Sequence, residues 1–332
     1  MRILLPGGSG QVGSILARHL HASGHEITVL SRTPQAHRSG HWRVLPWDGL
    51  TPGSWTAEID RSDAVIHLSG RSVDCRYNAA NRQAIFDSRI KPTLLLGKLI
   101  AASPTPPRLW MNASTSTFYR HALDRSQDEF TGELGDLPSE RGTREPMNLP
   151  ETWSFSIDVA SSWERAFLSI PTPRTRKIRL RSSMVMSPDP GGVFSVLSNL
   201  VRKGLGGSIG SGRQFVSWMH DLDFCRATDL LLAQPEITEE TGGIVNMTAP
   251  DPLPNRDFMR ALRRAWHMPI GLPATEWMIE IGTWLMHSES ELVLKSRRVV
   301  PTLLLKHGFE FAFPTWPAAA QDLVARTRAA RL

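Results

Sequence analysis

The chain has 332 residues, of which 41% are hydrophobic and 21% charged, and its formal net charge is +6. This length suffices for one large or two modest domains whose apolar core needs no disulfide and no structural metal. The only cysteines are Cys75 and Cys225, which excludes a disulfide scaffold, a zinc finger and an iron–sulfur cluster and indicates a reducing compartment. No apolar run reaches the ~20 residues that span a bilayer, and the first residues do not resemble a signal peptide. We therefore expect a cytoplasmic globular protein that binds no metal and no membrane.

The positive net charge does not predict a nucleic-acid partner. The basic residues are scattered, as at Arg32, Arg82 and Arg260, and they form no polybasic block and no known nucleic-acid motif. The same surplus of charge attracts an anionic small molecule, so we expect a small-molecule substrate. The oligomeric state stays open, with a homodimer among the possibilities.

The first half of the chain alternates short apolar runs with segments of helical periodicity. This alternation predicts an α/β fold with a doubly wound parallel sheet of the Rossmann type. The expected strands are Ile3–Leu5, Ile27–Leu30, Ala64–Leu68, Arg108–Asn112 and Ile178–Leu180, and the expected helices include Val12–Leu20, Thr93–Ala101 and Ile157–Phe167.

The texture of the sequence changes near Pro188, where prolines and glycines interrupt the alternation. A predicted helix at Val193–Val201, a glycine-rich segment over 204–212 and a mostly helical tail follow. We predict a first domain over 1–187 and a smaller C-terminal domain over 188–217 and 249–332 that caps the C-terminal edge of the sheet. Residues 218–248 are expected to return to the first domain, with a strand at Ile244–Asn246.

Three glycines, Gly7, Gly10 and Gly13, follow the first predicted strand at spacings of three and open a predicted helix. Glycines at this spacing allow a tight turn, a close approach of the backbone to a pyrophosphate and close packing of helix on strand. The start of the helix, with Gln11 and Val12, offers free N–H groups and a positive dipole end to the phosphates. The motif therefore predicts a dinucleotide site.

The end of the second predicted strand distinguishes between the two nicotinamide dinucleotides. An NAD site usually places Asp or Glu there, whereas this chain has Ser31 and Arg32. A hydroxyl and a guanidinium suit a 2′-phosphate, so the sequence favours NADP(H) over NAD(H). The alternative is that Arg32 is merely solvated on a loop.

Several segments together resemble the extended short-chain dehydrogenase/reductases. Val65–Gly70 is similar to their fourth strand and Asn112–Thr115 to their fifth. A finer likeness, to an atypical epimerase-like subfamily within the NAD(P)-dependent epimerase/dehydratase superfamily, is carried by Asp87–Arg89, Gly206–Gln214, Ser217–His220, Asn246–Pro250 and Gly308–Thr315. The resemblance extends from about residue 2 to residue 325.

This resemblance implies that residues 1–187 form a Rossmann domain with a bound NADP(H) and that the C-terminal domain forms the substrate pocket. It also implies that the exit of the fourth strand lies beside the nicotinamide ribose. It assigns Leu68, Ser69 and Gly70 to the cofactor site, together with Asp48 and Arg89, and it places the Ser114 hydroxyl on the reacting substrate oxygen. For Arg89 the alternative is a structural ion pair with Asp87.

Typical members of the superfamily use a Tyr and, four residues later, a Lys as their acid–base pair. The only tyrosines here, Tyr77 and Tyr119, are followed four residues on by Asn81 and Leu123, so the pair is absent. Phe155 and Val159 occupy the expected positions. The remaining catalytic candidates are Ser114 and Tyr119, the latter with a packing role as its alternative.

The glycine-rich loop before Arg213 and Gln214 exposes backbone N–H groups and predicts an anion-binding part of the substrate site. Ser217 and His220 are assigned to the same site. A lid without a ligand is the alternative for the loop, and a hydrogen bond to a neighbouring loop is the alternative for His220.

The leading hypothesis is an NADP(H)-binding atypical dehydrogenase/reductase-like protein, an oxidoreductase or sugar-nucleotide-epimerase-like enzyme that acts on a small anionic or sugar-like substrate. A non-enzymatic NADP(H)-responsive binding protein is the second hypothesis. A conventional sugar-nucleotide 4-epimerase is a third, and the missing Tyr–Lys pair weakens it.

Overall fold

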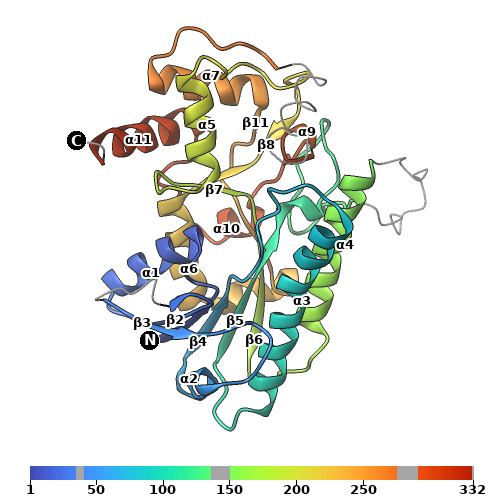
Figure 1. Cartoon of the computed structure of the whole chain (residues 1–332), viewed down its shortest axis with the longest axis vertical. Helices are drawn as coiled ribbons and strands as arrows, with labels where there is room; N and C mark the ends of the chain where they lie inside the picture. Colours follow the sequence, from blue (N-terminus) through green and yellow to red (C-terminus); the bar gives the residue numbers. More distant parts are fainter. Residues whose placement is uncertain (35–40, 136–149, 275–290, 331–332) are drawn as a thin grey trace.

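The computed structural model describes residues 1–34, 41–135, 150–274 and 291–330 (Figure 1). Its centre is a seven-stranded, all-parallel sheet in the order β10-β6-β5-β4-β1-β2-β3. The strands are β1 (Arg2–Pro6), β2 (Glu26–Ser31), β3 (Arg43–Pro46), β4 (Ala64–His67), β5 (Leu109–Thr115), β6 (Arg176–Ser182) and β10 (Ile244–Met247). The strand order reverses between β1 and β4, and in such sheets ligands bind outside the carboxyl ends of the strands at that point. The predicted Rossmann fold is confirmed.

Helices cover both faces of this sheet. On one face α1 (Gln11–Ala22) and α6 (Asp221–Ala233) pack on the side chains of alternate strand residues, such as Ile3 and Leu5. On the other face lie α2 (Ala57–Arg61), α3 (Ala79–Ala102) and α4 (Glu151–Leu168), and Figure 1 shows α3 and α4 side by side along it. The even positions of β5 face this second layer, because Trp110 packs there against Phe167.

The strands expected in the first half all form, but two details differ from the prediction. The edge strand β3 was not predicted, because its four residues are too short for a clear alternation. Helix α3 begins at Ala79 instead of Thr93, since the Asn78 side chain accepts a hydrogen bond from the N–H of Asn81 and caps the helix. The helix then continues through Pro92.

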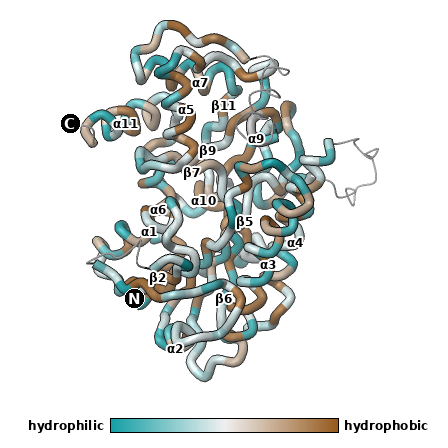
Figure 2. The backbone as a smooth tube through the Cα atoms, viewed as in Figure 1, coloured by the Kyte–Doolittle hydropathy of each residue, from teal (hydrophilic) through white to brown (hydrophobic). Residues whose placement is uncertain are grey.

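The upper part of Figure 1 is a second, smaller helical layer built on α5 (Val193–Arg202), α7 (Asn255–Trp266) and α11 (Trp316–Ala329). These helices share an apolar core in which the Trp316 ring stacks on Phe258 at 4.0 Å between ring centroids. In Figure 2, hydrophobic and hydrophilic residues alternate along α7, as expected for a helix with one packed face. Two short ladders connect the layers: β7 (Met184–Met186) pairs with β9 (Trp218–His220), and β8 (Phe215–Val216) with β11 (Leu253–Pro254).

The division of the chain between the two parts is more interleaved than the predicted boundaries. Residues 218–248 supply α6 and β10 to the sheet domain. The prediction placed all of 249–332 in the C-terminal domain, but α10 (Thr302–Lys306) buries Leu303 and Leu304 in the core of the sheet domain. These two leucines complete the apolar cover of β10, so the segment belongs to the first domain. Helix α9 (Glu291–Leu294) precedes it.

None of the helices that the structure describes is long and apolar enough to cross a membrane.

Candidate functional site

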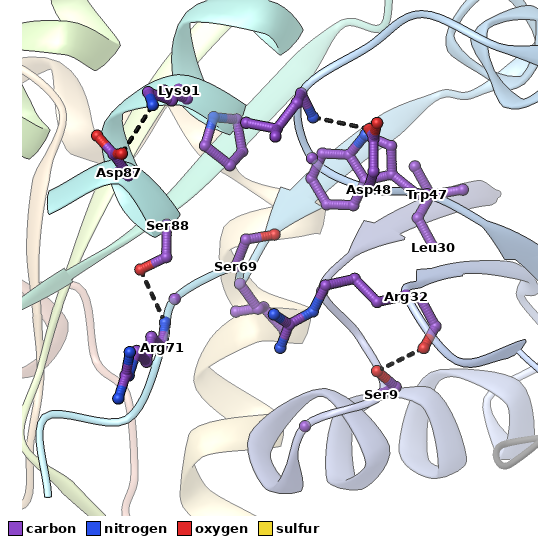
Figure 3. A pocket seen from close by; sticks show the side chains of 18 of the residues that line it. Ser9, Leu30, Arg32, Trp47, Asp48, Ser69, Arg71, Asp87, Ser88 and Lys91 are labelled. Carbon is purple, nitrogen blue, oxygen red and sulfur yellow. Dashed lines mark hydrogen bonds and ion pairs between the residues drawn. The ribbon is translucent and has the colours of Figure 1, made fainter. Parts of the chain in front are cut away.

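A cleft of about 590 Å³ opens at the carboxyl ends of β1, β2 and β4 (Figure 3). The glycine-rich turn forms one wall, the end of β2 and the loop after β3 a second, and the exit of β4 with the first half of α3 a third. Its lining includes Gly7, Gly10, Ser31, Arg32, Asp48, Leu68, Ser69 and Gly70. The crevice predicted from the sequence is therefore open, and residues from all three predicted cofactor segments meet in it.

The three glycines of the turn differ in how much space a side chain would find at their positions. Gly7 has a φ of +76°, and a Cβ there would lie 2.7 Å from the backbone nitrogen of Ser69. A Cβ on Gly13 would lie 2.4 Å from the Cα of Gly8, so the helix could not approach the turn. A Cβ on Gly10 would meet only the carbonyl oxygen of Gly7, at 3.7 Å. The protein itself does not need glycine at position 10, and the free space there lies on the cleft side.

Helix α1 begins in this cleft without any anion of its own. Its N-cap, Gly10, supplies no side-chain hydrogen bond, and its first turn contains no acidic residue. The first N–H groups of a helix have no partner within the helix, and the positive end of its dipole favours an anion. The Gln11 side chain turns away from this end and donates to the carbonyl oxygen of Asp189 at 3.1 Å, while Gln11 and Val12 both line a neighbouring cavity.

A positively charged side chain, Arg32, enters the cleft directly after β2. Figure 3 shows Arg32 extended across the cleft toward Ser69. Within the described ranges, its guanidinium makes no hydrogen bond or ion pair with protein. Ser31 is buried beside it and donates to the Ser9 hydroxyl at 3.0 Å. Asp48 accepts the N–H groups of Thr51 and Leu50, and these hydrogen bonds lower the pKa of its carboxyl.

The exit of β4 carries a buried hydroxyl without a partner. Ser69 Oγ is inaccessible to solvent and no described group hydrogen-bonds to it, although it borders the turn at Gly7. Arg89 lies against Gly70, with its guanidinium donating to the carbonyl oxygen of Arg71 at 3.0 Å. Burial lowers the pKa of Arg89 to about 10. The alternative ion pair between Arg89 and Asp87 does not form, because Asp87 pairs with Lys91 at 2.7 Å.

A second cavity, of about 300 Å³, adjoins the cleft and shares Leu68 with it. Its lining includes Ser114 at the end of β5, the beginning of α1 and the end of β6. The Ser114 hydroxyl donates to Oε1 of Glu164, at 2.6 Å, and so does not stand free. Glu164 in turn accepts two hydrogen bonds from the Arg181 guanidinium, at 2.8 and 2.9 Å. Burial alone would raise the pKa of Glu164, but Arg181 holds it below its usual value.

The two positions of the missing Tyr–Lys pair belong to an apolar cluster. Phe155 and Val159 are buried with Tyr77 and Ile85, and the Phe155 and Tyr77 rings lie 4.8 Å apart. Neither residue lines the cleft or the smaller cavity. In this chain α4, the helix on which the Tyr–Lys pair would lie, instead contributes Glu164, which contacts the smaller cavity only through its hydrogen bond with Ser114.

Tyr119 does not reach either cavity. It is buried, and its phenol donates to Oδ1 of Asn246 at 3.0 Å. Burial raises the pKa of this phenol, which opposes a role as a base. Tyr119 thus has the surroundings of a packed core residue, as in the alternative stated above.

The four residues expected in the substrate site do not line either cavity. Arg213 is exposed on the surface. Gln214 and Ser217 are buried and donate to the carbonyl oxygens of Ile209 and Arg297, both at 2.8 Å. His220 accepts the N–H of Leu222 at the start of α6 and bonds Asp322 of α11 at 3.0 Å, so its partners lie on two helices and not on a neighbouring loop.

Several backbone amides of the glycine-rich loop after α5 already donate to protein groups. The N–H groups of Gly207 and Gly210 donate to the carbonyl oxygens of Leu272 and Ala274, and that of Ile209 to the Asn255 side chain. An anion-binding loop needs unpaired amides. These amides bind the segment before residue 275 and are not available to an anion, while the anion site itself stays a prediction.

The cleft fits a dinucleotide on several independent grounds. Among the described residues there is space at Gly10, an uncapped helix N-terminus, a cation without a partner at Arg32 and an orphaned hydroxyl at Ser69. Together with the fold, these features define the class of the protein: a Rossmann-type nucleotide-binding protein of the extended dehydrogenase/reductase architecture.

Comparison with known proteins gives the family. The NAD dependent epimerase/dehydratase family matches residues 3–140, and a domain of unknown function, DUF1731, matches residues 274–323. The epimerase family protein SDR39U1 of Bos taurus is 31% identical over 98% of this chain and 100% of its own length. An epimerase family protein of Staphylococcus saprophyticus is 32% identical over 97% and 98% of the two chains. The chain belongs to this epimerase family, the atypical branch of the short-chain dehydrogenase/reductases.

Solved structures agree with this assignment. The crystal structure of human SDR39U1 with NADPH matches with a TM-score of 0.79 and 27% identity, over 98% of this chain and 99% of that one. The UDP-glucose 4-epimerase of Thermus thermophilus, in complex with NAD, has a TM-score of 0.66 at 15% identity over 99% and 100% of the chains, and it supports the fold alone.

The sequence reasoning missed the charged group beneath Ser114, which consists of Glu164, Arg179 and Arg181. A signal was present on both elements. Glu164 interrupts the apolar side of a helix, next to Trp163, and β6 alternates arginines with Ile178 and Leu180 although it lies inside the sheet. Charges at such positions must find partners, because burying an unpaired charge is costly.

Proposed function

We propose that this protein binds NADP(H) in the cleft, with the pyrophosphate at the glycine turn and the 2′-phosphate at Arg32. The observation that carries the proposal is the Arg32 guanidinium, which extends into the cleft where an NAD site would place a carboxylate and has no partner in the part of the chain that the structure describes. A planar guanidinium binds phosphate through two parallel hydrogen bonds. The NADPH in the human relative's structure supports the same choice.

The smaller cavity would take the nicotinamide end, since it adjoins the cleft at Leu68. Bound there, the cofactor supplies or accepts hydride. The residues of the chain hold the reacting groups: Val12 and Phe224 keep water from one side, and Ser114 presents its oxygen from the other. We propose an oxidoreductase or epimerase-like enzyme that acts on a small substrate.

A second function deserves a test because of the buried Phe155 and Val159. Without the phenol and the amine, a protein that binds NADP(H) and reports its presence to a partner needs no catalysis. The conventional 4-epimerase reaction is disfavoured by the same two residues, since that chemistry relies on a Tyr–Lys pair in the wider superfamily.

The experiment compares NADPH and NADH by titration calorimetry on the wild type, on Arg32→Ala and on Arg165→Ala. Arg165 is an exposed arginine on α4 outside both cavities, and it serves as the matched control. Loss of a charge-assisted contact costs about 1.5–3 kcal/mol, so NADPH affinity should fall by about 10–100-fold in Arg32→Ala alone.

NADH affinity should not change in either variant. An equal loss of affinity for NADPH and NADH in Arg32→Ala would show that Arg32 does not bind the 2′-phosphate. Undetectable binding of both by the wild type would refute the proposal. Turnover of NADPH with a panel of ketones, and of NADP+ with the matched alcohols, then separates the enzyme from the binding protein.

A further inference from the structure

The hydrogen bond between Ser114 and Glu164 determines which way the Ser114 hydroxyl faces. Glu164 receives Arg181 through both carboxylate oxygens, and Arg179 lies 3.3 Å from Oε2. Two guanidinium groups keep this carboxylate ionised, and an ionised carboxylate only accepts hydrogen bonds. The proton of the 2.6 Å contact therefore belongs to Ser114 and points at Glu164, away from the smaller cavity.

The other hydroxyls of this cavity have the same polarity. Ser182 donates to the carbonyl oxygen of Leu180 at 3.3 Å, and Ser183 to that of Met247 at 3.1 Å. All three serines that line the cavity thus give their protons to the protein and leave lone pairs for a ligand. Its other described lining residues are apolar except for Gln11, and none carries a charge.

We propose that Glu164 is a positioning residue that holds Ser114 as a hydrogen-bond acceptor, so that the ligand group beside Ser114 is an uncharged O–H or N–H donor. A hydroxyl group, as in an alcohol or a sugar, fits this position. A carbonyl oxygen, a carboxylate or a phosphate would face lone pairs there and leave its own acceptors unpaired, which is costly in a buried site.

This inference rests on the proposed NADP(H) site and refines the substrate class given there. Of the anionic and sugar-like substrates expected, only a hydroxyl-bearing group suits the position beside Ser114, and any anionic group must lie away from Ser114. It also changes the expected role of Ser114, which was a donor to the substrate oxygen. A donated proton makes the serine oxygen a stronger acceptor, because neighbouring hydrogen bonds polarise one another.

Two substitutions distinguish this role from simple packing. In Glu164→Gln, the amide oxygen in place of Oε2 keeps the contacts of Arg181 Nη2 and Arg179, which together outweigh the single Arg181 Nε contact at Oε1. The amide nitrogen then takes the place of Oε1 and faces Ser114. The Ser114 hydroxyl becomes free to donate into the cavity, so its polarity is reversed. Ser114→Ala removes the group and leaves the arginine pair of Glu164 in place, and it serves if the glutamine variant does not fold.

The test uses protein saturated with the tetrahydronicotinamide analogue of NADPH, which cannot transfer hydride. Dissociation constants for two matched pairs of probes, cyclohexanol with cyclohexanone and 2-propanol with acetone, are measured by ligand-observed NMR titration. Ser169→Ala is the control, since the hydroxyl of this serine at the end of α4 donates to the carbonyl oxygen of Ala166 and lines neither cavity.

In the wild type and the control we expect the alcohols to bind about tenfold more tightly than the matched ketones, as one correctly paired hydrogen bond implies. The ratio should fall toward one in Ser114→Ala and below one in Glu164→Gln. A wild-type ratio of one or less, affinity for none of the probes, or an unchanged ratio in Ser114→Ala would overturn the inference. Calorimetry with the analogue alone reports separately on the proposed cofactor site.

Discussion

Substitution of the three glycines of the turn by alanine separates binding from folding. The space around each position differs: an added methyl at Gly10 meets one oxygen at 3.7 Å, which is an ordinary contact. At Gly13 the methyl would lie 2.4 Å from one backbone atom and 2.5 Å from another. At Gly7 it would lie 2.7 Å from Ser69, on a backbone with φ of +76°.

These distances set the expected magnitudes. Because the backbone at Gly10 has a φ of −72°, alanine fits there, and the change in unfolding free energy should stay within about 0.5 kcal/mol. Overpacking at Gly13 should cost about 1–3 kcal/mol. Gly7→Ala should cost at least as much, because it adds the strain of a left-handed backbone to the steric conflict.

The loss of NADPH affinity should follow the opposite order to the loss of stability and be largest for Gly10→Ala. The methyl of Gly10→Ala occupies the space that a pyrophosphate needs beside the start of α1, so we expect at least a tenfold loss of NADPH affinity. The assay combines chemical unfolding without ligand and calorimetry with NADPH on the same preparations. Gly24→Ala is less suitable as a control because its φ is also positive, and Ser14→Ala, one turn into α1, is preferable.

The reasoning would be refuted by a Gly10→Ala protein that keeps the affinity of the wild type. It would equally fail if Gly10→Ala lost as much stability as Gly13→Ala, since the loss of binding would then reflect unfolding and not an occupied cradle.

Two more predictions concern residues outside the cleft. Burial raises the pKa of Glu129 to about 7, although it accepts N–H groups from β10 and α10, so the folded state holds this proton between about pH 4.5 and 7. The protonated Glu129 therefore stabilises the folded state fully below pH 4.5, and this stabilisation is lost as the pH rises through 7. The unfolding free energy of the wild type relative to that of Glu129→Gln should fall by about 3 kcal/mol between pH 4.5 and 8. A difference between the two proteins that does not depend on pH would contradict this prediction. Restoring the missing pair with Phe155→Tyr and Val159→Lys should lower stability by more than about 2 kcal/mol and create no turnover of NADPH, because both side chains lie in the apolar cluster with Tyr77. New turnover in the stably folded double variant, measured by NADPH absorbance, would show that these positions reach the substrate.

The sequence by itself determined those features that depend only on a residue and its immediate neighbours along the chain. Buried-strand runs and helical periodicity predicted the parallel sheet, because burial on both faces imposes a continuous apolar run. The glycine spacing predicted the turn, since a positive φ and a close approach of backbones are requirements of single residues. Arg32 was also found from its place at the end of a strand, and the structure leaves it open toward the cleft.

What the tertiary structure decided is the partner of each polar side chain. Ser114, Tyr119, Gln214 and His220 all carry groups capable of chemistry, and nothing in the sequence tells which of them is already hydrogen-bonded. The fold brings Glu164 to Ser114 from 50 residues away and Asn246 to Tyr119 from 127 residues away. A donor or acceptor is available to a ligand only when no distant segment satisfies it, and that depends on packing between elements.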